Sequence, residues 1–282
     1  MIFKLWRILG NDLPPRHSET QTEDNLDFIL KNESPFENCE KLFLLNRIVD
    51  QEKEKRLRLK INNAGHRVIT MKFEPDKFLS IRSLKDRIRY ATNVNYARNY
   101  CVNFSLFEGA DVVCPMDGGM YYTDAGWNGF AQVAEENLED GYFAFATWRL
   151  FSYDDVLSES LLPQFKSEYR FGTQISLGPT ELQLALTSHS DQRFDESLMY
   201  GSADKVEFLY RLGLHGLWDH WEPSLKLAAM NKKSKFYDSV RVALPGYVCR
   251  LPSGNCEADH NNECRGKQRW AGVNRLLAVA GS

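Results

Sequence analysis

The 282-residue sequence has no apolar run near ~20 residues, the length that a membrane-spanning helix needs. The opening, MIFKLWRILG, places Lys4 and Arg7 inside its apolar stretch. It lacks the long apolar region and small-residue cleavage site of a secretory signal peptide, and is more typical of a first core strand. We therefore expect no transmembrane segment and a cytoplasmic protein, in the host cytoplasm if the protein is viral.

An excess of basic charge is also lacking. Lys and Arg total 35 against 38 Asp and Glu, which gives a net charge of -3. Domains that bind nucleic acid through a broad face are usually basic, so we expect no nucleic-acid partner. The basic run at residues 53–60 is interleaved with glutamates and is typical of a solvated helix face.

The six cysteines include no tight C-x2-4-C knuckle, the spacing that most structural zinc sites carry. Three of them lie in or next to apolar stretches and are typical of small buried side chains, namely Cys39, Cys101 and Cys114. The others form a C-x6-C-x7-C cluster with one histidine near the C-terminus, namely Cys249, Cys256, His260 and Cys264. We expect free thiols here, and a metal site at this cluster stays the alternative.

Strands and helices alternate along the first part of the chain. Apolar runs predict strands at 2–9, 41–49, 66–73, 110–116 and 142–151, and helical spacing predicts helices at 22–32, 51–65, 83–106 and 125–138. Thr22 is the expected N-cap of the first helix. Such alternation predicts an α/β fold with a mostly parallel sheet. Further on, we expect a strand at 170–178 and helices at 203–212, 222–231 and 267–279, with an irregular tail from residue 245.

Polar clusters fall where three of these strands end. They are Asn11-Asp12, Asn46-Arg47 with Asp50, and Asp117-Gly118-Gly119. Ligands of open α/β sheets bind outside the carboxyl ends of the strands, so the clusters together predict one shared pocket. Taken singly, each is also an ordinary turn.

One segment, residues 87–124 (RIRYATNVNYARNYCVNFSLFEGADVVCPMDGGMYYTD), resembles family-2-type glycosyltransferases with the GT-A fold. Ala97-Arg98-Asn99 matches the family's "ARN" helix, Ala110-Asp111 opens the buried strand, and Asp117-Gly118-Gly119 takes the place of the D-x-D turn. The resemblance implies a mixed, mostly parallel sheet flanked by helices. A Rossmann-like nucleotide-binding half, residues 1–125, would precede an acceptor-side half, residues 126–245, with 246–282 as a Cys-rich tail and helix packed on the domain.

The resemblance also implies a nucleotide-sugar co-substrate and a divalent cation, Mn²⁺ or Mg²⁺, that neutralises the leaving diphosphate. Asp117 would hold the cation, with Arg89, Arg98 and Asn99 nearby, and Gly118 would let the backbone approach the ligand. The second acidic position of the family is a glycine here. His220, or alternatively His215, would supply the missing ligand.

A second segment, residues 194–213 (FDESLMYGSADKVEFLYRLG), resembles the family's "FDE-x-L" and "G-x-x-D" stretch. The resemblance makes Asp204 the general base that deprotonates the acceptor, and a helix N-cap is its other interpretation. Ala203 stands where the family carries a glutamate. Asp195 and Glu196 would contact the acceptor, and Trp218 and Trp221 would stack on it or pack in the core.

The function that this resemblance implies is an inverting glycosyltransferase, a hexosyl- or related transferase. It would move a sugar from a nucleotide-sugar donor to a glycan or another hydroxyl-bearing acceptor. A catalytically degenerate module that binds a nucleotide or glycan is the first alternative, favoured by the DGG turn and by Ala203. A sugar nucleotidyltransferase is the second, although its loop after the first strand is usually Gly-rich, whereas GNDLPPRH has one glycine.

Overall fold

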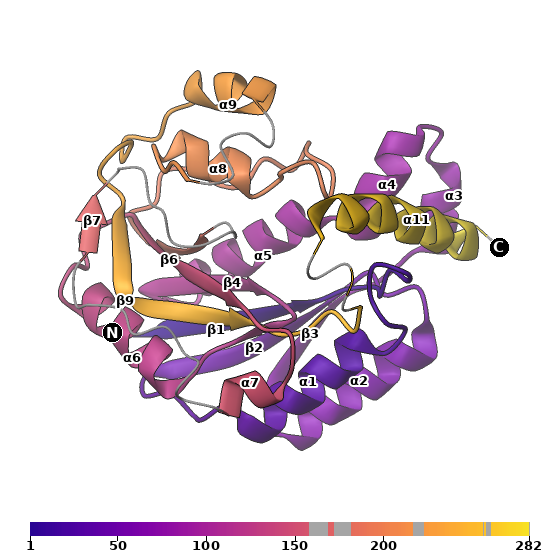
Figure 1. The fold of residues 1–282 in the computed structure, drawn as a ribbon, viewed down its shortest axis with the longest axis horizontal. Coiled ribbons are helices and arrows are strands. Elements are labelled where there is room, and N and C mark those ends of the chain that lie inside the picture. The colour runs from indigo at the N-terminus through magenta and orange to yellow at the C-terminus, as the bar shows by residue number, and fades with distance from the viewer. Residues whose placement is uncertain (158–168, 172–181, 217–222, 256, 258–260, 282) are drawn as a thin grey trace.

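A computed structural model describes residues 1–157, 169–171, 182–216, 223–255, 257 and 261–281. Its strands are β1 (Phe3–Leu9), β2 (Cys39–Asn46), β3 (Arg67–Met71), β4 (Val112–Asp117), β5 (Met120–Tyr121), β6 (Tyr142–Arg149), β7 (Tyr169–Phe171), β8 (Gln183–Thr187) and β9 (Arg241–Arg250). They form one sheet in the order β3-β2-β1-β4-β8-β6-β9-β5, and β7 pairs with β9 (Figure 1).

Most of the paired length in this sheet is parallel. β1 runs parallel to β2 and β4, and β2 runs parallel to β3. β8 is antiparallel to both β4 and β6, which gives β6 the direction of β4, and β9 is parallel to β6. The expected α/β class, with a mixed, mostly parallel sheet flanked by helices, is confirmed. The carboxyl ends of β1, β2, β4, β6 and β9 consequently point the same way.

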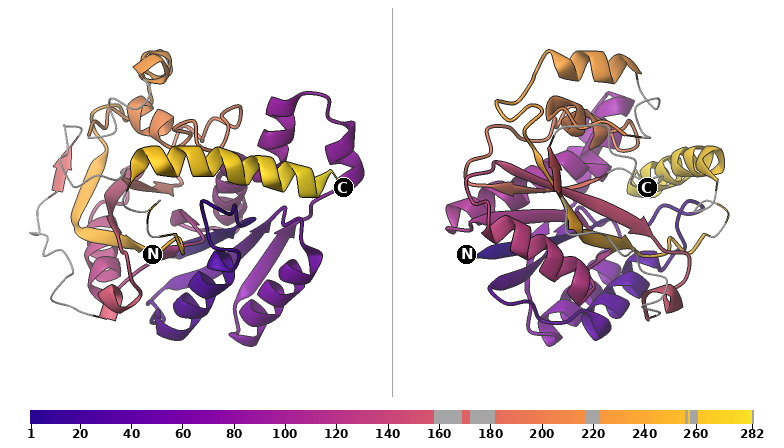
Figure 2. Two further views of the ribbon diagram at one scale, coloured as in Figure 1. Left: turned by 45° about the vertical axis from the view of Figure 1, so that its right-hand side comes forward. Right: turned by 60° about the vertical axis from the view of Figure 1, so that its left-hand side comes forward.

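Helices flank the sheet. They are α1 (Gln21–Asn32), α2 (Gln51–Asn63), α3 (Pro75–Ser80), α4 (Leu84–Thr92), α5 (Val94–Phe107), α6 (Asp124–Glu135), α7 (Asp154–Leu157), α8 (Val206–Arg211), α9 (Pro223–Met230) and α11 (Asn262–Ala280). Figures 1 and 2 show α1 and α2 side by side, and α11 lying across the molecule beside α3 and α4. Within the described part of the chain, each helix is too short or too polar to cross a bilayer.

The central strand β1 has apolar side chains on both faces, as expected of a strand covered by helices on each side. Leu9 packs with the apolar residues of α1 and α2, whereas Trp6 packs against α5. Trp6 also donates a 2.7 Å hydrogen bond from Nε1 to Ser105 Oγ, so its one polar atom is satisfied inside the core. Fully burying an apolar side chain of this size contributes about 1.5–3 kcal/mol.

Three local expectations are corrected by the structure. The single helix expected at 83–106 is two helices, because Asn93 takes a positive φ of 26° and turns the chain between α4 and α5. Thr22 is not the N-cap of α1. The N-cap is Thr20, which makes no side-chain capping bond, and Thr22 lies inside the helix.

The third correction concerns the tail expected from residue 245, whose beginning belongs to strand β9. The Pro245-Gly246 pair had indicated a loop, but the pairing with β6 shifts register at this point, and the irregularity accommodates both residues. Gly246 is needed there because a Cβ would lie 2.7 Å from Phe130 Cβ. The expected strand at 170–178 is described only as β7, and its remaining residues lie outside the described ranges. The division of the chain at residues 125 and 245 stays a prediction.

Candidate functional site

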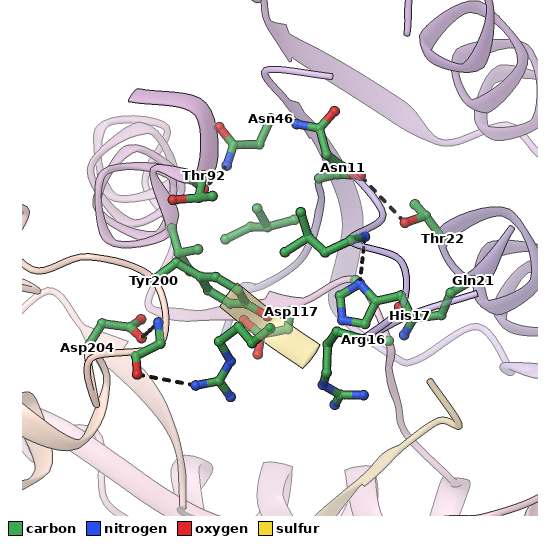
Figure 3. Close-up of a pocket in the computed structure, with 18 of the residues that line it drawn as sticks. Asn11, Arg16, His17, Gln21, Thr22, Asn46, Thr92, Asp117, Tyr200 and Asp204 are labelled. Atoms are coloured by element: carbon green, nitrogen blue, oxygen red, sulfur yellow. Dashed lines mark hydrogen bonds between the residues drawn. The ribbon is translucent and has the colours of Figure 1, made fainter. Parts of the chain in front are cut away.

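A cavity of about 660 Å³ opens where the parallel strands end. Its lining comes from the end of β1 and the residues that follow it, from helix α1, from the ends of β2, β4, β6 and β9, from the junction of α4 and α5, and from the segment 200–206. Helix α11 closes one side with Arg265, Arg269 and Leu276. Figure 3 shows Asp117, Asp204, Arg16 and His17 around this space. Each of the three polar clusters expected to share a pocket thus contributes to this cavity, through Asn11, Asn46 and Asp117-Gly118-Gly119, whereas Asp12, Arg47 and Asp50 do not line it.

Arg98 joins the two carboxylates of the cavity. Its Nη2 donates to Asp117 Oδ1 at 2.9 Å and its Nη1 to Asp204 Oδ2 at 2.8 Å. The side chain is 5% exposed, and its Nη1 also donates to Asn95 Oδ1 at 2.8 Å. Asn95 in turn donates to the carbonyl oxygen of Asp204 at 3.1 Å, which fixes the backbone of that residue. The fork of one guanidinium thus sets the spacing of both carboxylates.

Asp117 is held in its charged form. Burial alone raises the pKa of its carboxyl, but the charges of Arg98, Lys205 and Arg250, with the bond from Arg98, outweigh burial and hold the pKa well below its usual value. Arg250 Nη1 lies 3.5 Å from Asp117 Oδ2. Both oxygens of Asp117 therefore face arginines. Burial acts to lower the pKa of Arg98, and the two carboxylates reverse this effect and raise it.

Cationic side chains dominate the rest of the lining. Among the described residues around the cavity, seven cationic side chains stand against two carboxylates, and the cationic ones are Arg16, Arg98, Arg149, Lys205, Arg250, Arg265 and Arg269. Of these, only Arg98 was expected from the sequence. Lys205 follows Asp204 directly, and Arg149 lies two residues before the end of the predicted strand 142–151, so a motif or a strand end marked the position of both. The α11 arginines had no local signal.

His17 is the neutral member of this wall. Burial, followed by the charges of Arg16, Arg250 and Arg269, lowers the pKa of its imidazole well below the usual value. Leu13 N donates to His17 Nδ1 at 3.3 Å, so the ring proton of the neutral form resides on Nε2. Since His17 lines the cavity, it can offer Nε2–H as an uncharged donor to a ligand oxygen.

Arg269 ties α11 to the segment that carries Asp204. Its Nη1 donates to the carbonyl oxygen of Gly201 at 3.2 Å, and its guanidinium lies 5.3 Å from the centre of the Tyr200 ring. Gly201 has φ +87°, and a Cβ at this position would lie 2.6 Å from Arg269 Cδ. Glycine suits the positive φ at this position, and a side chain here would displace the Arg269 side chain.

Six of the sequence-predicted site residues line the cavity, namely Asn11, Asn46, Arg98, Asp117, Gly118 and Asp204. Asn11 braces the loop after β2, because its Nδ2 donates to Arg47 O and its Oδ1 accepts from Val49 N, each at 2.8 Å. Gly118 is needed for packing, since a Cβ would lie 2.9 Å from the carbonyl oxygen of Ile8 on β1. The N-cap of α8 is Lys205, so Asp204 immediately precedes the cap.

Three predicted residues hold the scaffold instead. Asp12 forms an ion pair with Lys53 and accepts from Thr22 N at 3.1 Å. Asp50 caps α2 by accepting from Lys53 N at 3.0 Å. Asn99 is buried in α5 and binds both backbone groups of Phe194, with distances of 2.9 Å, as well as Glu196 Oε1 at 2.8 Å. None of these three residues lines the cavity in the described part of the structure.

Arg47, Arg89 and Glu196 line a second, more open pocket of about 450 Å³. Arg47 lies over the Tyr90 ring at 4.0 Å, and Arg89 donates to Asp86 at 2.7 Å. Asp195 makes a local turn, in which it accepts from Ser197 N at 2.9 Å. The acceptor-side roles of Asp195 and Glu196 stay predictions.

The expectation of Mn²⁺ or Mg²⁺ at Asp117 and His220 stays a prediction, because His220, Trp218 and Trp221 lie outside the described residues. Among the described residues, the groups paired with Asp117 are the guanidinium groups of Arg98 and Arg250, which do not fit a cation at its carboxylate. Within the described ranges, no group of three His, Cys, Asp or Glu side chains is placed to ligate a metal.

Of the C-terminal cluster, Cys249 is buried in β9 and Cys264 lies on α11, while Cys256 and His260 are not described.

No protein-family model and no curated protein matches the chain. Among solved structures, S. aureus TarS 1–349 in complex with UDP is similar over 99% of this chain and 65% of that chain, with 13% identity and a TM-score of 0.46. A structure of a longer TarS chain matches over 99% of this chain and 39% of that chain, with 14% identity and a TM-score of 0.42. Mannose-1-phosphate geranyltransferase from Thermus thermophilus has 15% identity and a TM-score of 0.32 over 89% of this chain and 74% of that chain. Similarity at this level assigns no role to any residue.

Proposed function

We propose that the protein is an inverting glycosyltransferase that uses a nucleotide-sugar donor. One observation carries the proposal: the carboxylate of Asp204 lines the same cavity as a wall of arginine and lysine side chains. A carboxylate can take the proton from an acceptor hydroxyl, and clustered cationic side chains can bind a diphosphate. A volume of about 660 Å³ lies within the range of sites that enclose ligands of this size.

The proposed reaction is a single displacement. Asp204 Oδ2 is engaged by Arg98, whereas Oδ1 accepts only a long bond of 3.4 Å from Gly201 N in the described structure, so Oδ1 is the oxygen that takes the acceptor proton. The acceptor oxygen then forms a bond to the anomeric carbon as the bond from that carbon to the diphosphate oxygen breaks. The diphosphate leaves with the electron pair, and the configuration at the carbon inverts.

The experiment is a thermal-shift and hydrolysis screen of UDP-, GDP-, CMP- and dTDP-sugars with and without Mn²⁺, on wild type and on Asp204→Asn. We expect one donor to raise the melting temperature and to release its free nucleotide slowly. Asp204→Asn should keep the thermal shift and lose donor hydrolysis, because the amide cannot accept the proton of the attacking water. Near-normal hydrolysis by Asp204→Asn would contradict the role of Asp204 as the base, and no thermal shift with any donor would contradict the proposed function.

A nucleotide-binding module without catalysis is the second candidate. It is favoured by the engagement of Asp204 with Arg98, since a carboxylate tied to a buried guanidinium also serves as a structural ion pair. Under this alternative, a donor stabilises the protein equally in wild type and Asp204→Asn, and no nucleotide is released from either protein over long incubation.

A further inference from the structure

The two carboxylates of the cavity are arranged around one arginine side chain. Arg98 donates to Asp117 and to Asp204 at 2.9 and 2.8 Å, and Arg250 approaches the other oxygen of Asp117 at 3.5 Å. A divalent cation beside these oxygens would face the buried charge of Arg98 at short range in a poorly solvated site. It would also need several further oxygen ligands. The geometry consequently disfavours a cation between the two carboxylates.

The cationic side chains of the cavity act on both Asp117 and His17. Lys205 and Arg250 both act electrostatically on Asp117, and Arg250 also acts on His17 together with Arg16 and Arg269. Arg250, Asp117 and His17 line the same cavity, and Arg250 Nη1 lies 3.5 Å from Asp117 Oδ2. We name Arg16, Lys205, Arg250 and Arg269 the cationic band. Its residues come from the loop after β1, the start of α8, the end of β9 and helix α11, which are far apart in the sequence and come together in the folded chain.

We propose, on the basis of the function proposed above, that the cationic band binds the diphosphate of the nucleotide sugar and neutralises it without a divalent cation. Arg98 positions Asp117 and Asp204 in the way that a metal ion positions its ligands, and the band takes up the negative charge that the diphosphate gains on leaving. Guanidinium groups suit this role because they stay charged and present paired donors that match phosphate oxygens.

The test is titration calorimetry of the full chain with inorganic pyrophosphate and with UDP and GDP, in EDTA and again in Mg²⁺ or Mn²⁺. We expect pyrophosphate to bind in EDTA with a Kd within about threefold of its value with metal, and the affinity to fall steeply with added salt. Binding that requires the metal would overturn the inference and leave the proposed function in place. Pyrophosphate binding in EDTA with no response to any nucleotide sugar would support the band and overturn the proposed function.

Asp117→Asn distinguishes two possible roles of Asp117, as a metal ligand or as a carboxylate that only lies next to the cationic band. If Asp117 is a metal ligand, its replacement should weaken diphosphate binding at least about tenfold in the presence of metal. A carboxylate that merely faces the band would, when neutralised, leave binding unchanged or tighter, because one negative charge near the anion is gone. We expect the second result, measured with pyrophosphate in both buffers.

Variants of the band complete the test. Arg250→Gln and Arg269→Gln should each weaken pyrophosphate binding about tenfold, as expected for loss of a charge-assisted hydrogen bond. Arg275→Gln is the matched control on α11, because Arg275 is 59% exposed, pairs with Glu19 and does not line the cavity. Unchanged affinity in both band variants, or an equal loss in the Arg275 control, would overturn the inference. Melting temperatures of all three variants identify any loss that comes from misfolding.

Discussion

Arg98 Nη1 and Asp204 Oδ2 lie 2.8 Å apart, although the two residues are separated by 106 positions in the sequence. Arg98 belongs to α5, and Asp204 lies in the segment that leads into α8. The contact therefore fastens the second half of the chain to the first at the edge of the cavity. It is mostly shielded from water, since the two side chains are 5% and 14% exposed.

Removal of Arg98 should be costly for this reason. Arg98→Ala leaves Asp117 and Asp204 without their shared partner, and breaking a buried pair in this way typically costs about 3–5 kcal/mol. Arg98→Lys keeps the charge but cannot donate to both carboxylates in the same planar geometry, so we expect an intermediate loss. Urea titration of both variants gives the free energy of unfolding and so measures the two losses of stability.

Arg56→Ala is the control for the Arg98 variants. Arg56 is 53% exposed and pairs with Glu23 at the surface. Pairs of this kind contribute at most about 1 kcal/mol, so the control should stay close to wild type. An Arg98→Ala protein as stable as the Arg56→Ala protein would contradict the structural role given to Arg98.

The elements predicted from the sequence are mainly those whose side chains show a regular apolar pattern. Strand β1 and helices α1 and α2 lie within a few residues of their expected positions. The strand is buried on both faces and so leaves a continuous apolar run, whereas each helix buries one side and so leaves a periodic pattern. The helix break at Asn93 was missed because nothing in the apolar spacing of residues 83–106 marks it. β9 was missed because Pro245-Gly246 is the usual signature of a turn.

The candidate site was predictable only where a local motif carried it. Arg98, Asp117 and Asp204 stood out because each lies in a segment with a resemblance to a known pattern, and the structure brings these three together. Arg250 and Arg269 could not be found in this way. Their position depends on the pairing of β9 and on the packing of α11, which are long-range contacts without a signal in the neighbouring residues.

Stability should fall with decreasing pH through His17. The folded protein holds the pKa of His17 well below the usual value, whereas the unfolded chain has about 6.5. Below pH ~6.5 the unfolded state therefore binds a proton that the folded state does not, and stability is lost until the folded pKa is reached. The contribution is at most about 1.4 kcal/mol per pH unit.

His17→Asn isolates this contribution, because its Oδ1 can replace His17 Nδ1 as the acceptor for Leu13 N. Urea titrations at pH 7.5 and pH 5.5 should show a smaller loss for the variant than for wild type. An identical pH dependence in the two proteins would show that other groups, and not His17, cause the acid sensitivity.

Gly201 should not tolerate a side chain. Gly201→Ala places a Cβ at φ +87° and 2.6 Å from Arg269 Cδ. The backbone conformation alone costs about 1–2 kcal/mol, and the contact would displace Arg269 from the segment that carries Asp204. We expect a lower melting temperature together with weaker pyrophosphate binding. Gly10→Ala is the control, since a Cβ there has nothing within 4 Å and Gly10 also lines the cavity.

Two glycines of α11 should respond in opposite directions to alanine. Gly272 lies against the loop after β1, where a Cβ would be 2.4 Å from the carbonyl oxygen of Leu13, whereas a Cβ at Gly266 has nothing within 4 Å. Gly266→Ala should therefore stabilise the protein by about 0.5–1 kcal/mol through helix propensity. Gly272→Ala should lower the melting temperature, because α11 must move away from Leu13 and loosen the cavity wall. Equal stabilisation by both substitutions would mean that α11 does not pack on this loop in solution.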